Sequence, residues 1–198
     1  MTRGSLFLES FMDVRAAIRT RRSIKAFTGQ AIPRSVLEVL LTDATWAPTH
    51  RLTQPWRFAV FDQSAIRRLA DFLRATPAIA AVPDPAKGQA KLAKLLERLP
   101  GLGAMVLVTW VRDADTAVDL EDHAAASAAV QNLLLAATAA GLGSFWSTNH
   151  TLGHPEVLRF AGADPAREGF LGALWLGHAA ETPAAPPRRP LADVARFL

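Results

Sequence analysis

The most hydrophobic stretch of the chain is an alanine-rich run, HAAASAAVQNLLLAATAAG, at residues 123–141. Its length is close to that of a short membrane-spanning helix, which needs about 20 apolar residues. The run also contains Ser127, Gln131, Asn132 and Thr138, and it is richer in Ala than in Leu. We therefore expect a helix buried in a protein core, with no membrane partner. Its small side chains would allow close helix packing, either within the chain or across a dimer interface.

Shorter apolar stretches with helical and strand periodicity alternate along the rest of the chain. Strands are expected at 57–61, 104–111, 144–147 and 169–177, and helices at 13–21, between Pro33 and Pro48, and at 64–74, 88–98 and 155–161. This mixture predicts one α+β domain over residues 1–198, with helices flanking a central, mostly antiparallel or mixed sheet.

Three further segments fall outside this pattern. Residues 1–12 lack the apolar region of a signal peptide, and we expect them to form a loose N-terminal extension. Residues 75–87 contain three prolines and are expected to form a loop or lid. The tail at 182–198 is proline-rich and then amphipathic, and we expect it to extend across a partner subunit.

The composition excludes several kinds of site. The chain has no Cys and no Tyr, so disulfides, thiolate metal sites, iron–sulfur clusters and Cys or Tyr catalysis are ruled out. The absence of Cys is consistent with a cytoplasmic location. The net charge is +4, but the basic residues are spread along the chain, so no nucleic-acid partner is expected. His150 and His154 have the spacing of a helical metal pair, but Gly153 and Pro155 disfavour a helix there, and no metal site is expected.

Two short polar segments interrupt the apolar pattern. The first is RRSIK, which places Arg21, Arg22, Ser23 and Lys25 just past the end of a predicted helix. Arginine forks and a serine hydroxyl suit phosphate oxygens, because charge-assisted bonds match that geometry. In an extended segment, Ser23 and Lys25 would share one side while Ile24 points away. A solvated basic turn is the alternative interpretation.

The second polar segment is APTHRLTQPWRF at residues 47–58. Two prolines restrict its backbone, and its polar side chains are His50, Arg51, Thr53 and Gln54. Such a loop would suit the hydrogen-bonding edge of a planar heterocycle, although an ordinary polar connection is the alternative. No GxGxxG, Walker A or GxSxG motif is present, so neither a Rossmann nor a P-loop nucleotide site is expected.

Taken in order, five segments resemble motifs of the nitroreductase family of FMN-dependent flavoproteins. They are RRSIKAF, WAPTHRLTQPWRFAVF, AAVQNLLLAATAAGLGSFW, FLGALWLGHA and RRPLADVARF. The short length and the A-P-x-H loop are most similar to the small NAD(P)H nitroreductases of that family. The resemblance implies a homodimer with FMN sites at the subunit interface.

By motif position, the resemblance also implies a set of cofactor-binding residues. Arg21, Arg22 and Ser23 would hold the FMN phosphate, and Lys25 would lie near the flavin N1–O2 edge. The remaining contacts would come from three places: the partner-facing loop with Trp46, Thr49 and His50, the ring-lining Trp146, Ser147 and Thr148, and the tail with Arg188 or Arg189. Many members of the family have Asn where Leu52 stands, so the pairing at the pyrimidine edge differs here.

The implied activity is an FMN-dependent oxidation of NADH or NADPH. In this ping-pong scheme the donor gives hydride to flavin N5 and leaves, and a nitroaromatic, quinone or related small acceptor then binds in its place. The flavin carries the chemistry, so no side chain need be a strong acid or base. Two alternatives remain: an FMN-binding relative that stores or fragments flavin without NAD(P)H turnover, and a cofactor-free basic interaction module.

Overall fold

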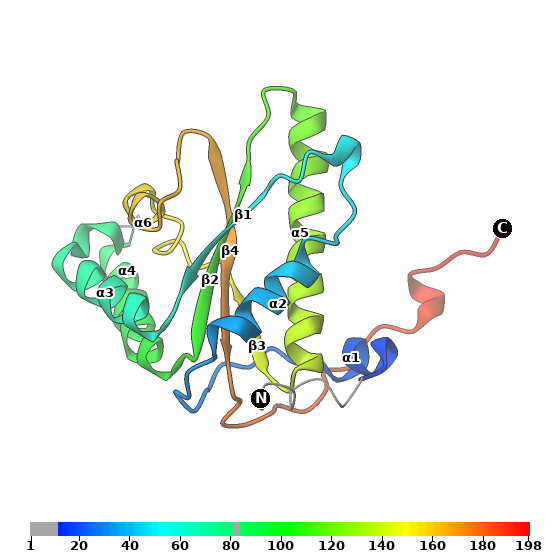
Figure 1. Cartoon of the computed structure of the whole chain (residues 1–198), viewed down its shortest axis with the longest axis horizontal. Helices are drawn as coiled ribbons and strands as arrows, with labels where there is room; N and C mark the ends of the chain where they lie inside the picture. The colour runs from blue at the N-terminus through cyan, green and yellow to red at the C-terminus, as the bar shows by residue number, and fades with distance from the viewer. Residues whose placement is uncertain (1–11, 81–83) are drawn as a thin grey trace, which may run out of the picture.

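The computed structural model describes residues 12–80 and 84–198 (Figure 1). Most of the predicted N-terminal extension and residues 81–83 of the predicted lid therefore lie outside the described residues. At the centre is a four-stranded sheet in the order β1-β2-β4-β3, in which every neighbouring pair is antiparallel. Its strands are β1 (Trp56–Phe61), β2 (Ala104–Val111), β3 (Gly143–Ser147) and β4 (Glu168–Gly177). The predicted α+β class and the antiparallel sheet are confirmed.

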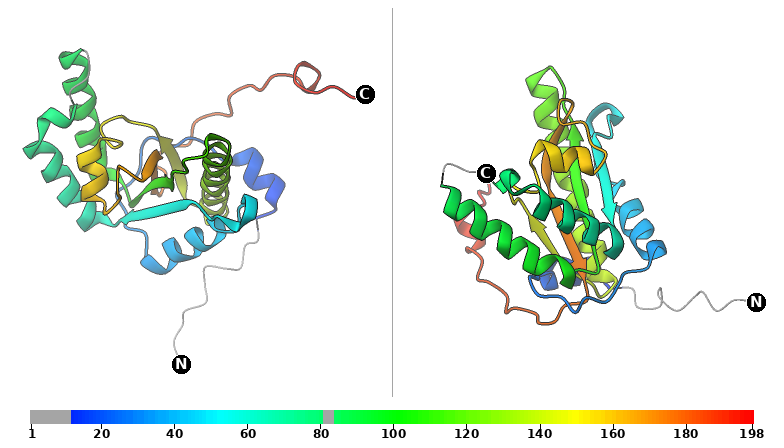
Figure 2. Two further views of the ribbon diagram at one scale, coloured as in Figure 1. Left: turned by 90° about the horizontal axis from the view of Figure 1, so that it is seen from above. Right: turned by 90° about the vertical axis from the view of Figure 1, so that its left-hand side faces the viewer.

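Helices cover both faces of the sheet (Figure 1, Figure 2). One face packs against α2 (Arg34–Ala44) and α5 (Thr116–Ala139), with α1 (Val14–Thr20) alongside α5. The other face packs against α3 (Gln63–Ala75), α4 (Pro85–Arg98) and α6 (Pro155–Phe160). The central strands β2 and β4 are apolar on both faces because each face carries its own hydrophobic core.

The alanine-rich run forms most of α5, and its small side chains build the core on that side. Ala126, Ala129 and Ala137 are fully buried beside Leu133, as expected for a core helix. Asp115 caps the start of α5 by accepting hydrogen bonds from the backbone of Ala117 and Val118. No helix among the described residues is both long and apolar enough to span a membrane.

The loop predicted at residues 75–87 is only partly confirmed. Residues Pro77–Ala80 form a 3₁₀ turn, and α4 begins at Pro85, three residues before the predicted start at 88. Asp84 caps this helix through Lys87, and Pro85 fits its first turn because a helix leaves the first backbone N–H groups unpaired. The three prolines led to the prediction of a loop, but one of them, Pro85, is the first residue of α4.

After β4, His178 and Ala180 form backbone hydrogen bonds with Thr28 and Ala26, and the chain then leaves the body of the molecule. Residues 180–198 are almost entirely exposed, and they project outward as an extended tail with one 3₁₀ turn at Leu191–Asp193 (Figure 1, Figure 2). Leu191, Val194 and Phe197 in this tail are exposed apolar residues. These apolar side chains are typical of a packed segment, yet none of them is buried against another described residue.

Candidate functional site

The RRSIK segment docks beside β3, although the two are far apart in the sequence. Ile24 donates its backbone N–H to the carbonyl oxygen of Ser144 at 2.9 Å, and Ser23 forms an isolated parallel bridge with the same residue. The Ile24 side chain is buried against Gly143, where an added Cβ would lie 2.9 Å from Ile24 Cγ1. Gly143 therefore allows the basic segment to approach the strand, and we call residues 21–25 together with β3 the β3 edge.

Side chains alternate along the basic segment as predicted. Ser23 and Lys25 are exposed, whereas Ile24 is buried. Lys25 Nζ lies 5.5 Å from the centroid of the Phe145 ring on β3, within the range of a cation–π contact. Lys25 therefore lies on the same side of β3 as Phe145.

A cavity of about 460 Å³ lies between the β3 edge and α4. Its lining includes the three predicted ring-contacting residues, Trp146, Ser147 and Thr148, together with Phe145 and Trp175. Helix α4 contributes Lys91, Lys94, Leu95 and Arg98, and the loop after β3 adds Asn149 and His150. The volume is within the range of small-molecule and cofactor sites, about 300–1,000 Å³.

Two features of this cavity's walls depend on the neighbouring strand. The indole Nε1 of Trp146 donates to the carbonyl oxygen of Leu171 at 3.1 Å, and the ring covers Gly172, where an added Cβ would collide with it. Gly172 has φ +152°, which L side chains rarely adopt. Trp175 Nε1 and Ser144 Oγ are buried and have no hydrogen-bond partner among the described residues. Trp175 lines the cavity, but its Nε1 is buried beneath the cavity surface.

The two arginines of the basic segment are placed differently. Arg22 Nη1 donates to the carbonyl oxygens of Arg19 at 2.7 Å and Arg21 at 2.9 Å, so its guanidinium folds back on its own backbone. Arg22 also lines a separate cavity of about 180 Å³ next to the end of α5. Arg21 is half-buried and has no ion pair among the described residues. Of these two arginines, Arg21 therefore has the guanidinium with fewer hydrogen bonds to the described residues.

The second polar segment, the 47–55 loop, folds against the start of α5. Thr49 Oγ1 lies 2.9 Å from Thr53 Oγ1 and accepts a hydrogen bond from Gln54 N. Thr53 Oγ1 donates to Asp122 Oδ1 at 2.5 Å, and Asp122 is buried. The sequence reading missed Asp122, because its loop partner is 69 residues away along the chain.

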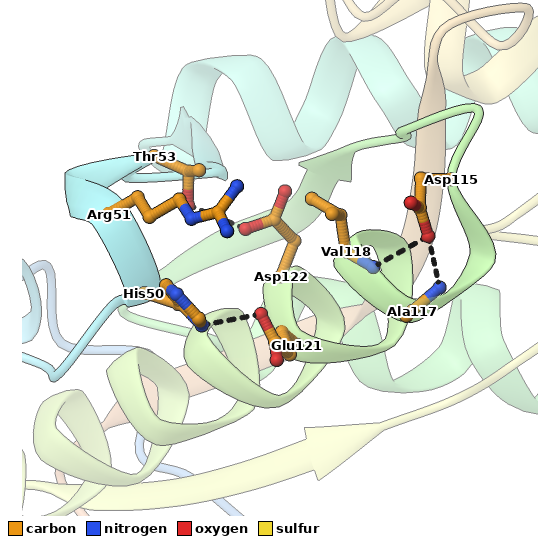
Figure 3. Close-up of a pocket in the computed structure, with 8 residues that line it drawn as sticks. All are labelled: His50, Arg51, Thr53, Asp115, Ala117, Val118, Glu121 and Asp122. Carbon is orange, nitrogen blue, oxygen red and sulfur yellow. Dashed lines mark hydrogen bonds and ion pairs between the residues drawn. The ribbon is translucent and has the colours of Figure 1, made fainter.

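His50 also bonds to α5 within its own chain. Its Nδ1 lies 2.7 Å from Glu121 Oε2, and the pair borders a cavity of about 230 Å³ that Asp115 and Asp122 also line (Figure 3). Trp46, in contrast, is 81% exposed. The predicted contacts of Trp46, Thr49 and His50 with a partner's flavin remain a prediction, since a single chain does not test them.

Charged groups also fix the turn that leads into α5. Asp119 accepts hydrogen bonds from Arg112 Nε at 2.8 Å and from Trp110 Nε1 at 3.1 Å. The side-chain bond from Arg112 is the main reason that the pKa of Asp119 lies below its ordinary value, and the Trp110 indole lowers it further. The carboxylate therefore stays charged and anchors β2 to the helix that carries Glu121 and Asp122.

The β3 edge and the 47–55 loop lie at opposite ends of α5 (Figure 1). Glu121 is in the second turn of this helix, and β3 follows its last residue, Ala139, by four positions. The distance from Glu121 to Ala139 is about 27 Å along the axis, at 1.5 Å per residue. Arg188 and Arg189 are exposed in the projecting tail. The structure therefore brings Ser23 beside Ser144 and Lys25 beside Phe145 on the strand that carries Trp146 and Ser147, but it does not bring the loop or the tail arginines there.

Comparison with known proteins identifies similar chains of about the same length. A profile described as the Nitroreductase family matches residues 18–178. "Putative NAD(P)H nitroreductase YfhC" of Bacillus subtilis is 30% identical over 180 residues, covering 91% of each chain. The 5,6-dimethylbenzimidazole synthase of Rhodospirillum rubrum is 32% identical over 192 residues, covering 89% of this chain and 87% of that protein.

Solved structures give the same result. A nitroreductase-like family protein from Bacillus cereus aligns with a TM-score of 0.82 at 25% identity, covering 96% of this chain and 98% of the other. A Desulfovibrio desulfuricans protein, described as "a putative nitroreductase in complex with fmn", aligns with a TM-score of 0.72 at 32% identity, covering 94% and 97%. From the profile match, the full-length relatives and the shared fold, we conclude that this chain belongs to the nitroreductase family.

Proposed function

We propose that the protein is an FMN-dependent NAD(P)H oxidoreductase that reduces nitroaromatic, quinone or related small acceptors. The observation that carries this proposal is the docking of the basic RRSIK segment on β3, beside a cavity lined by aromatic and cationic side chains. The FMN described in the Desulfovibrio desulfuricans structure supports the same cofactor here. When bound, FMN supplies a ring that accepts hydride from the nicotinamide at N5 and passes it to the acceptor.

The residues at the β3 edge fit such a group. The cavity has aromatic walls for a planar ring, and none of the described residues that line it is acidic. Arg21, Arg22 and Ser23 would hold the phosphate, and Lys25, beside Phe145, would place a cation against the ring. Trp146, Ser147 and Thr148 would shield the bound ring from water, which strengthens the effect of these charges.

We also propose that the working unit is a homodimer with a shared site. A two-fold axis across α5 would place the N-terminal half of one helix beside the C-terminal half of the other. Thr49 and His50 of one chain would then approach the β3 edge of its partner. Exposed apolar residues on α1, α5 and the 47–55 loop support a partner surface: Val14, Ile18, Leu120 and Leu52. The tail, with Arg188 and Arg189, would cross the same interface.

The first experiment examines the purified protein for bound cofactor. The proposal predicts a yellow protein that releases near-stoichiometric FMN on heating and is bleached by NADH or NADPH without oxygen. A colourless protein that does not take up added FMN would contradict every flavin function and favour the basic interaction module.

Flavin fragmentation is the second candidate, favoured by the 32% identity to the protein named 5,6-dimethylbenzimidazole synthase. It predicts a yellow protein whose FMN is not bleached by NADH or NADPH. Supplying chemically reduced FMN and oxygen would then yield a benzimidazole product by mass spectrometry. Bleaching by NAD(P)H with intact FMN recovered after many turnovers would exclude it.

A further inference from the structure

Helix α4 presents a row of cations to the cavity at the β3 edge. Lys91, Lys94 and Arg98 all line this cavity, at helical spacings that place them on one face of α4. Lys91 and Lys94 are exposed, and Arg98 is half-buried. Glu97 lies on the same helix but does not line the cavity. The charged side chains that α4 contributes to the cavity lining are therefore all positive.

This arrangement is unfavourable for an isolated helix. Like charges four residues apart destabilise a helix by about 0.2–0.5 kcal/mol per pair, and Lys94–Arg98 is such a pair, although Glu97, three residues after Lys94, offsets part of this cost. None of the three forms an ion pair with a described residue, whereas Lys87 on the same helix lies 3.0 Å from Asp84. The helix dipole accounts for Arg98, which is in the last turn, but not for Lys91, which is almost two turns earlier.

The cation row lines a cavity that the segment expected to hold the cofactor phosphate does not line. Arg21 to Ser23 dock along β3 near Ser144, whereas the cations of α4 surround the opening together with Thr148, Asn149 and His150. A planar molecule entering over Phe145 and Trp175 would pass Lys91 and Lys94. An anionic substituent on that molecule would be attracted there, because clefts lined by one sign of charge concentrate opposite charges.

We propose that Lys91 and Lys94 select redox partners that carry a negative group, a carboxylate or phosphate, next to the planar reactive part. This inference rests on the proposed FMN function and adds the class of molecule that the site prefers. The anionic group has two possible sources: the phosphates of the nicotinamide donor, or a carboxylate on the acceptor. Either source uses the same pair of lysines.

The test compares Lys91→Gln/Lys94→Gln with wild-type protein loaded with FMN. The ligands are 4-nitrobenzoate and 4-nitrobenzyl alcohol, a matched pair that differs in the negative group, followed by NADH and NADPH as donors. Dissociation constants come from perturbation of the flavin spectrum, and KM values from steady-state rates. We expect a loss of roughly three- to tenfold for the anionic ligand, since each exposed charge contact contributes about 0.2–1 kcal/mol.

The matched control is Lys87→Gln, whose side chain pairs with Asp84 and does not line the cavity. It should behave as wild type, and Lys91→Arg/Lys94→Arg should restore the preference because it keeps both charges. In the wild type, the preference should shrink as salt rises, because screening weakens exposed charge contacts. A purely structural role for the lysines would produce neither the rescue nor the salt effect.

The two sources give different results. Weaker 4-nitrobenzoate binding with unchanged 4-nitrobenzyl alcohol binding assigns the lysines to the acceptor, and a higher KM for NADH or NADPH alone assigns them to the donor. A yellow, NAD(P)H-bleached variant with wild-type constants for all four ligands overturns this inference and leaves the proposed function intact. A colourless wild-type protein would instead overturn the proposed function and the inference with it.

Discussion

At the β3 edge, Phe145, whose ring lies 5.5 Å from Lys25 Nζ, borders a cavity of about 460 Å³, whereas the 47–55 loop at the other end of α5 borders one of about 230 Å³. The first cavity has cationic and aromatic walls, and its cations lack carboxylate partners among the described residues. In the second, the histidine and a threonine already bond to the carboxylates of Glu121 and Asp122. The two polar segments look equally suited to a ligand in the sequence, but His50 and Thr53 of the second already have hydrogen-bond partners within the chain.

This difference suggests separate roles for the two regions. The β3 edge has the groups needed to bind an anionic planar molecule, and its backbone is fixed by pairing with a strand. The 47–55 loop is fixed by side-chain bonds, and Arg51, Leu52 and Gln54 have positive φ angles of 51°, 55° and 45°. The loop is thus held in one unusual shape, which suits a surface that a second chain meets.

The largest expected effect tests how tightly the β3 edge is packed. Gly172→Ala should lower the free energy of unfolding by about 2–5 kcal/mol, because the new Cβ would collide with Trp146 at a backbone angle that favours glycine. Gly162→Ala is the control, since Gly162 has φ +81° but open space around it, and it should cost only about 1–2 kcal/mol. Urea denaturation measures both, and equal losses would show that Trp146 yields readily.

The next effect concerns cofactor retention at the β3 edge. Arg21→Ala should weaken FMN binding by about 1.5–3 kcal/mol, or roughly 10- to 150-fold, because a charge-assisted contact is lost. Arg22→Ala should have a smaller effect, because its guanidinium already bonds to two backbone carbonyls. Arg68→Ala, on α3, is the control. Fluorescence titration of released FMN at fixed salt measures all three, and wild-type retention in Arg21→Ala would remove its assigned role.

A pH-dependent effect tests the anchoring of α5 near the 47–55 loop. The pKa of Asp119 is lower in the folded state than in the unfolded chain, so its stabilisation is fully present above the unfolded value, about 3.9. It is lost as the pH falls through the lower, folded-state pKa. Asp119→Asn should therefore cost about 1–3 kcal/mol at pH 7 and progressively less below pH 4. Denaturation curves across this range measure the difference, and a cost independent of pH would contradict the ionic contribution.

The smallest expected effect concerns the strained backbone of the loop. Leu52 has φ +55°, a left-handed conformation that Asn adopts more readily than Leu. Because Leu52 is also exposed, Leu52→Asn should raise the free energy of unfolding by about 0.5–1 kcal/mol in the single chain. Thermal denaturation measures the gain. A loss of stability would indicate that Leu52 is packed against a second chain.

Much of the fold was predictable because local periodicity determines it. The strand at 104–111 was predicted with the observed ends, and Asp13 caps α1 as its position before an apolar run indicated. The start of α4 was missed because proline can either end a helix or occupy its first turn. At Pro85 the second case holds, and the structure shows it through the capping hydrogen bond that Asp84 accepts from Lys87 N.

The candidate site was less predictable than the fold. Alternation indicated that Ser23 and Lys25 would face one way, and the structure confirms it. The cations of α4 and the partners of His50 and Thr53 were not identified, because contacts between distant segments depend on the tertiary arrangement. Arg188 and Arg189 are exposed in the projecting tail, so the phosphate contact proposed for them depends on a second chain.

The central claim is that the β3 edge of one chain and the 47–55 loop of another form one FMN site. Co-expression of two differently tagged chains, one with Arg21→Ala/Lys25→Ala and one with His50→Trp, followed by tandem purification, isolates mixed dimers. Each parent homodimer should hold little FMN, because both of its sites are damaged, and each mixed dimer should regain one intact site of two, or about half the wild-type FMN. A mixed dimer that holds no more FMN than its parents would show that the site is not shared between chains.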